Sequence, residues 1–173
     1  MLGLTDMAHQ LTTSYVADAL TVLRQYKTMA ERAIEQASDK QLTEMLDPES
    51  NSIAIIVKHM TGNMRSRWRD FLTTDGEKPD RDRDSEFERP PASRAELLRN
   101  WEDGWGYVFR AIEPLTDADL SRTITIRGEP HSVLQAITRA VAHYASHIGQ
   151  IVFLAKHYRS SEWKTLSMPR RRE

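Results

Sequence analysis

The chain has 173 residues, with 24 Lys and Arg against 25 Asp and Glu, so its formal net charge is −1. This length predicts a single domain over residues 1–173, and the charge balance argues against nucleic-acid binding, which needs clustered basic side chains. The absence of cysteine excludes disulfides and thiolate chemistry and fits a cytoplasmic location. Because no apolar run approaches about 18 residues, we expect no membrane span.

Two helices are predicted in the first half of the chain. Over residues 7–37, apolar residues recur at three- and four-residue steps, which is the period of one helix face. A short helical turn is expected at residues 41–46. The second helix is expected to begin at Ser52, with Asn51 or Ser52 as its N-cap, and to end near residues 73–76.

The longest irregular segment covers residues 77–92 and reads EKPDRDRDSEFERPPA, with three prolines and alternating charge. A loop of this length inside a compact domain is either functional or mobile. It could act as a lid, with Arg81, Arg83 or Arg89 holding an anionic substrate, or it could be a solvated charged loop. No general base can be named from the sequence, since the positions of Asp84 and Glu86 depend on how this segment folds.

The second half of the chain predicts two more helices and a short extended segment. Ser93, with Glu96 three residues later, forms the start signal of a third helix that carries apolar residues to Ile112. One further helical turn is expected at residues 116–120. Alternation at residues 123–127 predicts a short hairpin, and a fourth helix is expected from residue 131 or 132 to 158. The tail, residues 159–173, could dock through Trp163, Leu166 and Met168.

Four amphipathic helices without a strand system predict an all-α four-helix bundle. The connections before and after the second helix are both long enough to cross the bundle, so a simple up-down-up-down order is not required. The aromatic residues Trp68, Trp101, Trp105 and Tyr144 stand at helical spacing and are expected in the core. The long amphipathic surfaces also suggest that two chains pair as a homodimer.

Histidine placement is the most informative feature of the sequence. His143 and His147 lie four residues apart in the last predicted helix, so both rings lie on one face with bases about 6 Å apart. Two such imidazoles can converge on zinc, nickel, copper or iron. Two partly exposed histidines without a metal would show the same spacing. The nearby Ala136 and Ala140, however, are small and leave room for an ion, which favours a metal site. The remaining histidines, His9, His131 and His157, are expected to be solvated or local.

His59, in the second predicted helix, is the natural third ligand, although it projects away from the centre of the apolar stripe. The sequence after His143 lacks the glutamate of a zinc protease. Three histidines without a carboxylate ligand leave coordination positions open, as in catalytic rather than structural metal sites. Asn63 and Gln150 lie about one turn from a ligand and could orient imidazoles, or they could be polar contacts between helices.

Two stretches resemble the DinB-like (YfiT-like) superfamily: SIAIIVKHMTGNM at residues 52–64 and HYASHIGQ at residues 143–150. The similarity extends over nearly the whole chain. It is strongest with a branch of unassigned function, whose members share the stretch at residues 68–78 and the SEWK sequence at residues 161–164. The resemblance implies a four-helix bundle, usually dimeric. It also implies a zinc or nickel site formed by His59, His143 and His147.

The resemblance supports a metal site better than it supports a reaction. Characterised relatives are S-transferases or isomerases that use low-molecular-weight bacterial thiols, and others have no known activity. The first hypothesis is therefore a metal-dependent enzyme, a thiol S-transferase or a hydrolase, acting on a small thiol or electrophile. The alternatives are a non-catalytic, stress-associated metal-binding dimer and a helical interaction module with an empty site.

Overall fold

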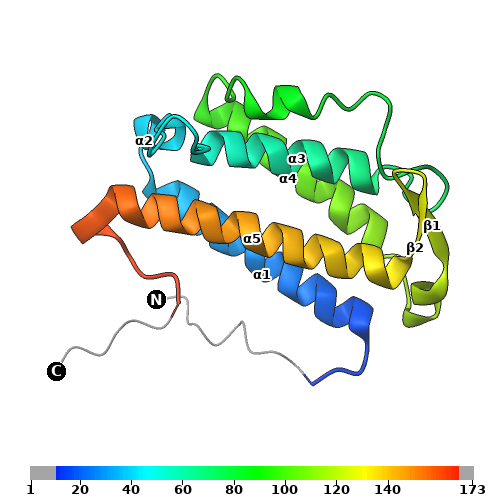
Figure 1. The fold of residues 1–173 in the computed structure, drawn as a ribbon. Helices are drawn as coiled ribbons and strands as arrows, with labels where there is room; N and C mark the ends of the chain where they lie inside the picture. Colours follow the sequence, from blue (N-terminus) through cyan, green and yellow to red (C-terminus); the bar gives the residue numbers. More distant parts are fainter. Residues whose placement is uncertain (1–10, 168–173) are drawn as a thin grey trace.

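The computed structural model describes residues 11–167, which form helices and one short hairpin (Figure 1). The α-helices are α1 (Tyr15–Gln36), α2 (Asp39–Thr43), α3 (Ile53–Trp68), α4 (Arg94–Ile112) and α5 (Val133–Arg159). The strands are β1 (Thr123–Ile126) and β2 (Glu129–Ser132), and the 3-10 turns are η2 (Asp84–Phe87), η3 (Asp117–Ser121) and η4 (Ser160–Glu162). The predicted all-α bundle with a hairpin before the last helix is confirmed.

The four long helices form two packed pairs. Helix α1 packs mainly against α5, α3 packs mainly against α4, and α3 also contacts α5. Helices α3 and α4 run in the same direction, so segment 69–93 returns along the length of the bundle before α4 begins (Figure 1). The second of the two long connections is therefore the crossover, and it brings η2 against α3.

Serine N-caps set where the long helices begin. Ser52, Ser93 and Ser132 each accept a hydrogen bond from the backbone N–H three residues later, as the sequence predicted for α3 and α4. Helix α1 begins later than predicted because Ser14 caps it, and residues 11–14 are not helical. The predicted residues 7–10 lie outside the described part of the chain.

Helix α3 ends at Trp68, short of the predicted 73–76. The chain turns there because Asp70 takes a left-handed conformation, with φ of 50°, and its carbonyl accepts hydrogen bonds from the N–H groups of Thr73 and Thr74. Phe71 is nevertheless buried at 5% exposure. The apolar stripe thus continued past the end of the helix, and the length of the stripe overestimated the length of the helix.

The hairpin is antiparallel and pairs Thr123 with Ser132 through Ile126 with Glu129. Its two turn residues, Arg127 and Gly128, both have positive φ, which suits a two-residue hairpin loop. In the tail, Trp163 and Leu166 pack partly against the core, whereas Met168 lies outside the described residues.

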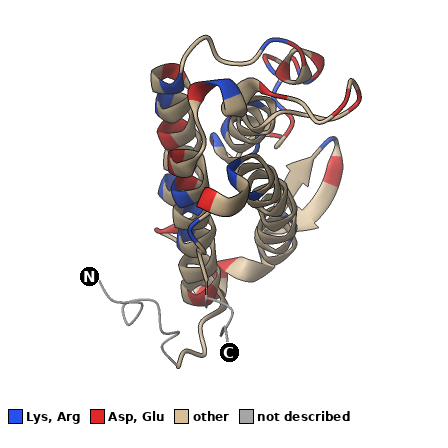
Figure 2. Cartoon of the chain, turned by 90° about the vertical axis from the view of Figure 1, so that its left-hand side faces the viewer, with Lys and Arg blue, Asp and Glu red and all other residues tan. Residues whose placement is uncertain are grey.

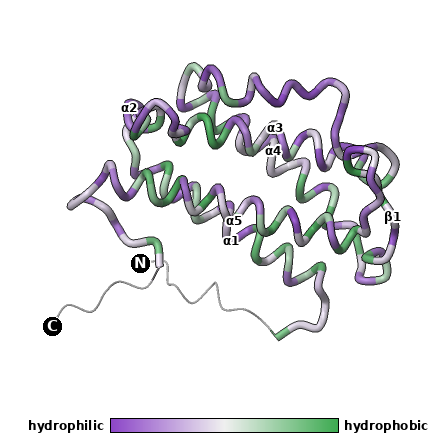
Figure 3. Tube along the Cα trace, viewed as in Figure 1, coloured by the Kyte–Doolittle hydropathy of each residue, from purple (hydrophilic) through white to green (hydrophobic). Residues whose placement is uncertain are grey.

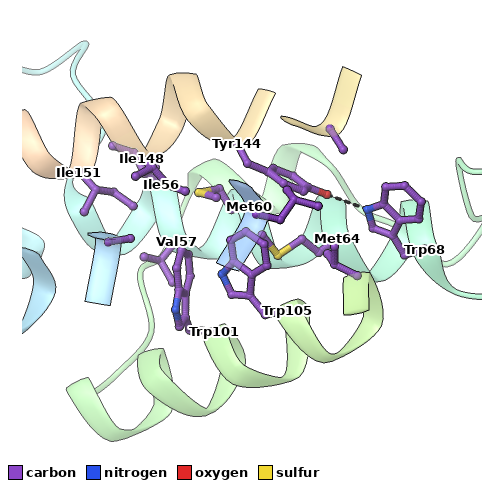
Figure 4. Packing of buried hydrophobic residues seen from close by; sticks show 14 of the residues in the cluster. Ile56, Val57, Met60, Met64, Trp68, Trp101, Trp105, Tyr144, Ile148 and Ile151 are labelled. Atoms are coloured by element: carbon purple, nitrogen blue, oxygen red, sulfur yellow. Dashed lines mark hydrogen bonds between the residues drawn. The ribbon is translucent and has the colours of Figure 1, made fainter. Parts of the chain in front are cut away.

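The core lies between the two helix pairs (Figure 4). Trp101, Trp105 and Tyr144 are fully buried, and Trp68 is 2% exposed, which confirms these aromatic residues as core. Trp68 Nε1 donates a hydrogen bond of 3.0 Å to the Tyr144 hydroxyl. The crossover segment is hydrophilic along most of its length, whereas apolar residues recur along the helices (Figure 3). In the described residues, no helix combines the length and apolarity needed to cross a membrane.

Candidate metal centre

The three predicted histidines meet between α3 and α5. His59 comes from α3, whereas His143 and His147 lie one turn apart on α5. One ring nitrogen from each residue lies within 4.8 Å of the other two. His59 is buried at 6% exposure, and the other two are half-buried. The structure therefore forms the cluster from two helices, as the sequence predicted.

Hydrogen bonds orient the imidazoles so that ring nitrogens face one another. Nδ1 of His59 donates to Glu86 Oε2 at 2.9 Å, and Nδ1 of His147 donates to Gln150 Oε1 at 3.0 Å. Both bonds place the ring proton on Nδ1 and leave Nε2 as a lone-pair donor. His147 Nε2 lies 3.0 Å from His143 Nε2. Because zinc–nitrogen bonds are about 2.0–2.1 Å long, two ligands of one ion lie roughly 3 Å apart.

The surroundings keep His143 and His147 uncharged. Burial, together with the neighbouring His147 and His59, lowers the pKa of His143 to about 4. Burial also lowers the pKa of His147. Only a neutral imidazole binds a metal ion, so near neutral pH His143 and His147 are in the state that coordination requires. The residues present fit a divalent cation by donor type, orientation and charge.

Glu86, whose place the sequence left open, is a buried partner of the site. Arg81 donates to it twice, from Nε to Oε1 at 2.8 Å and from Nη2 to Oε2 at 2.9 Å. Burial raises the pKa of Glu86, but hydrogen bonds from His59 and Arg81 outweigh this effect and the net pKa is lowered. The ionised carboxylate therefore holds His59 in place. Gly62 makes room for it, because a Cβ there would lie 2.3 Å from Glu86 Oε1.

Segment 77–92 contacts α3 through η2, so this part of it is not a solvated loop, while its role as a lid stays a prediction. The Phe87 ring lies 4.6 Å from the His59 ring. Lys58 donates from Nζ to the Arg89 carbonyl at 3.0 Å, so the backbone of Arg89 is tied to α3. Arg81 is almost fully buried between Glu86 and Glu77 and serves the protein's own carboxylates.

The two predicted supporting residues differ in what they contact. Gln150 hydrogen-bonds His147 directly, as described above. Asn63 Oδ1 instead accepts a hydrogen bond of 3.3 Å from the Tyr144 hydroxyl, so it orients that phenol. Of the remaining histidines, His131 bonds the Glu129 carbonyl and Arg139, and His157 is exposed beside Phe153. His9 lies outside the described residues.

A cavity of about 380 Å³ opens beside the cluster, and we call it the histidine cavity. His59, His143 and Tyr144 form part of its wall, and the small Ala136 and Ala140 widen it, as the sequence predicted for these alanines. The rest of the wall is dominated by arginine side chains from α3, α5, the crossover segment and the hairpin: Arg67, Arg81, Arg83, Arg127 and Arg139. Sequence inspection missed this grouping because the five lie far apart along the chain.

Comparison with known proteins identifies the family of this chain. The model of a family described as a protein of unknown function, DUF1572, matches residues 10–172. The chain belongs to the DUF1572 family. No protein of curated function matches this DUF1572 chain.

A solved structure supports the fold of this DUF1572 protein. The crystal structure of a DinB-like protein from Bacillus cereus matches it with a TM-score of 0.66 and 13% sequence identity. The match covers 86% of this chain and 95% of that one. The DinB-like fold that the sequence suggested is therefore confirmed, while this low identity shows the fold alone.

Proposed function

We propose that this DUF1572 protein binds a divalent metal ion, zinc or nickel, through His59, His143 and His147. The observation that carries the proposal is the convergence of three imidazole nitrogens within 4.8 Å, two of them oriented by Glu86 and Gln150. The Nε2 atoms of His143 and His147 lie 3.0 Å apart, close to the separation of two ligands on one ion, and burial disfavours protonation of either ring. These neutral nitrogens are the form of imidazole that coordinates a metal ion.

Metal analysis of the purified protein, followed by calorimetric titration of the metal-free protein with zinc and nickel, tests this proposal. We expect one ion per chain and loss of tight binding in His59→Ala and His143→Ala. His157→Ala is the matched control, because His157 lies on α5 but outside the cluster. A metal content far below one ion per chain, with no binding on titration, would contradict the proposal.

We further propose that the site is catalytic, of the thiol S-transferase or hydrolase type. Three protein ligands leave at least one coordination position for substrate or water, and the histidine cavity adjoins it. When bound, the metal would lower the pKa of a coordinated thiol or water. Glu86 and Gln150 hold the ligand rings, and the Tyr144 hydroxyl, held by Trp68 and Asn63, offers a fixed polar group at the cavity wall.

Turnover assays on the zinc- and nickel-loaded protein separate catalysis from simple metal binding. Low-molecular-weight thiols with a chromogenic electrophile test transfer, and chromogenic esters and amides test hydrolysis. We expect turnover in one of these assays and its loss in His143→Ala. Stoichiometric metal without turnover in any assay would favour the non-catalytic, stress-associated alternative.

Two further properties expected from the sequence complete the proposal. We propose that the protein acts in the cytoplasm, and that it forms a homodimer. Light scattering of the protein eluting from a sizing column measures its molar mass directly. A mass twice that of the 19.9 kDa chain is expected, and a mass equal to one chain would contradict the dimer.

A further inference from the structure

The wall of the histidine cavity carries one sign of charge. Five arginines line it, and no Asp or Glu is found among the described residues that do so. The chain as a whole is close to neutral, and both signs of charge are interspersed along its helices (Figure 2). The one-sided lining is therefore a local property of this cavity and not a consequence of overall charge.

Three of these arginines have carboxylate partners in the protein. Arg81 pairs with Glu86 and Glu77, Arg127 Nε lies 3.1 Å from Glu77 Oε2, and Arg83 Nη1 lies 3.9 Å from Asp84 Oδ1. Five guanidinium groups thus face three carboxylates, so two positive charges remain uncompensated beside the histidine cluster.

Arg67 and Arg139 carry the uncompensated charge. Neither forms an ion pair with a carboxylate in the part of the chain that the structure describes. Arg67 Nη1 is buried and has no hydrogen-bond partner there. Burial lowers the pKa of Arg67, Tyr144 and Glu77 oppose this shift, and the charges of Arg139 and Arg127 add to it. Because Arg67 lines the histidine cavity, an anion bound there would offset the charge of its guanidinium group.

Arg139 is held in position by a neighbouring histidine. His131 Nδ1 donates to the Glu129 carbonyl at 3.0 Å, which leaves its Nε2 as the acceptor. Arg139 Nη1 donates to that nitrogen, also at 3.0 Å. The hairpin thereby orients a guanidinium on α5 without neutralising it, so the remaining N–H groups are available to a ligand.

We propose that the histidine cavity binds a small molecule carrying two negative charges, as carboxylates or as a phosphate, between Arg67 and Arg139. The planar guanidinium group binds both kinds of oxyanion through two parallel hydrogen bonds. A volume of about 380 Å³ fits a small metabolite. The inference names the substrate class of the proposed metal site and in that respect rests on it, because His59 and His143 line the same cavity.

Calorimetry and thermal shift with succinate, inorganic phosphate and the neutral succinamide test the proposal on both metal-free and zinc-loaded protein. We expect a dianion to bind and succinamide not to bind. Arg139→Gln and Arg67→Met should each weaken dianion binding by about tenfold or more. Arg65→Gln is the matched control: Arg65 lies on α3, two residues from Arg67, but lines a different cavity.

The outcomes separate the proposals. Binding of succinate alone identifies carboxylates, and binding of phosphate alone identifies a phosphate group; either supports the anion site if Arg139→Gln weakens it and Arg65→Gln does not. Equal effects of these two variants, equal binding of succinamide, or no dianion binding to zinc-loaded protein would overturn it. Anion binding in a protein that binds no metal would refute the metal site and leave the anion site standing. Because Arg139 is exposed, its variant gives a result even if Arg67→Met fails to fold.

Discussion

The protein has two cavities that share Arg81 in their walls but differ in charge. The second, of about 250 Å³, is lined by Lys58, Arg65 and Arg69 together with Asp80, Asp82 and Asp103, and we call it the mixed-charge cavity. Basic and acidic side chains there offset one another, as in the 2.5 Å ion pair of Arg69 with Asp80. The charged side chains that line the histidine cavity are all arginines. In the mixed-charge cavity, the acidic side chains already compensate the basic ones. In the histidine cavity, the lining charges are all positive, so we expect an anionic ligand to bind there.

Arg81 lines both cavities, whereas Glu86, its buried partner, lines only the mixed-charge cavity. Both side chains are almost fully buried, at 4% and 6% exposure. On one side Glu86 fixes His59, and Arg81 keeps Glu86 ionised. Metal removal and substitutions of Glu86, Gly62 and Asp75 test whether this pair and the metal distinguish the two cavities.

Removal of the metal is expected to have the largest effect. An ion present at about 1,000 times its Kd adds roughly 4 kcal/mol to the free energy of unfolding, so chelation should lower the Tm by about 10 °C in a chain of this size. Calorimetry with and without chelator measures this shift. His143→Ala should abolish it and His157→Ala should retain it; an unchanged Tm in the parent protein would exclude a stabilising ion.

Replacement of Glu86 by alanine should cost about 3 kcal/mol of unfolding free energy, since it leaves a buried guanidinium and a buried imidazole without their partner. Metal affinity should also fall by about 10- to 100-fold. Urea denaturation and metal titration measure the two effects. Asp80→Ala in the mixed-charge cavity, where the pair is half exposed, is the control and should change neither. Equal effects of both variants would contradict the special role of the buried pair.

Gly62→Ala tests the space that Glu86 occupies. From helix propensity alone, the substitution should raise the free energy of unfolding by about 1 kcal/mol. The new Cβ, however, would displace the Glu86 carboxylate. We therefore expect a net loss of about 1–2 kcal/mol. Gly149→Ala on α5 is the matched control, because its Cβ would meet nothing within 4 Å and should stabilise the helix. The same denaturation experiment compares both, and stabilisation by both substitutions would show that Glu86 is free to move.

The smallest expected effect concerns the turn that carries Arg127. The Asp75 carboxylate accepts hydrogen bonds from the N–H groups of Glu77, Gly128 and Arg127, and these bonds lower its pKa below the ordinary 3.8. A lowered folded-state pKa stabilises the protein above pH 3.8, and this contribution is lost as the pH falls through the folded value. Asp75→Asn should reduce stability by less than about 1 kcal/mol near neutral pH, because the carboxylate is only half-buried and solvent screens its charge. The difference from the parent should vanish in acid.

Much of the secondary structure could be predicted, because helix signals are local. Serine caps and three- to four-residue periodicity placed the starts of α3, α4 and α5 to within a residue or two. The end of α3 was wrong, since an apolar residue such as Phe71 can be buried from a turn as well as from a helix. Periodicity reports which side chains are buried and does not by itself report the backbone that carries them.

The candidate site divides in the same way. The sequence by itself determined that His143 and His147 share a helix face, because a spacing of four residues has one geometric consequence in a helix, and it selected His59 through a family resemblance. Tertiary structure alone decided that Glu86 and Arg81 lie beneath His59 and that five distant arginines line one cavity. The irregular crossover and the hairpin bring these groups together, and contacts between segments far apart along the chain leave no periodic signal in the sequence.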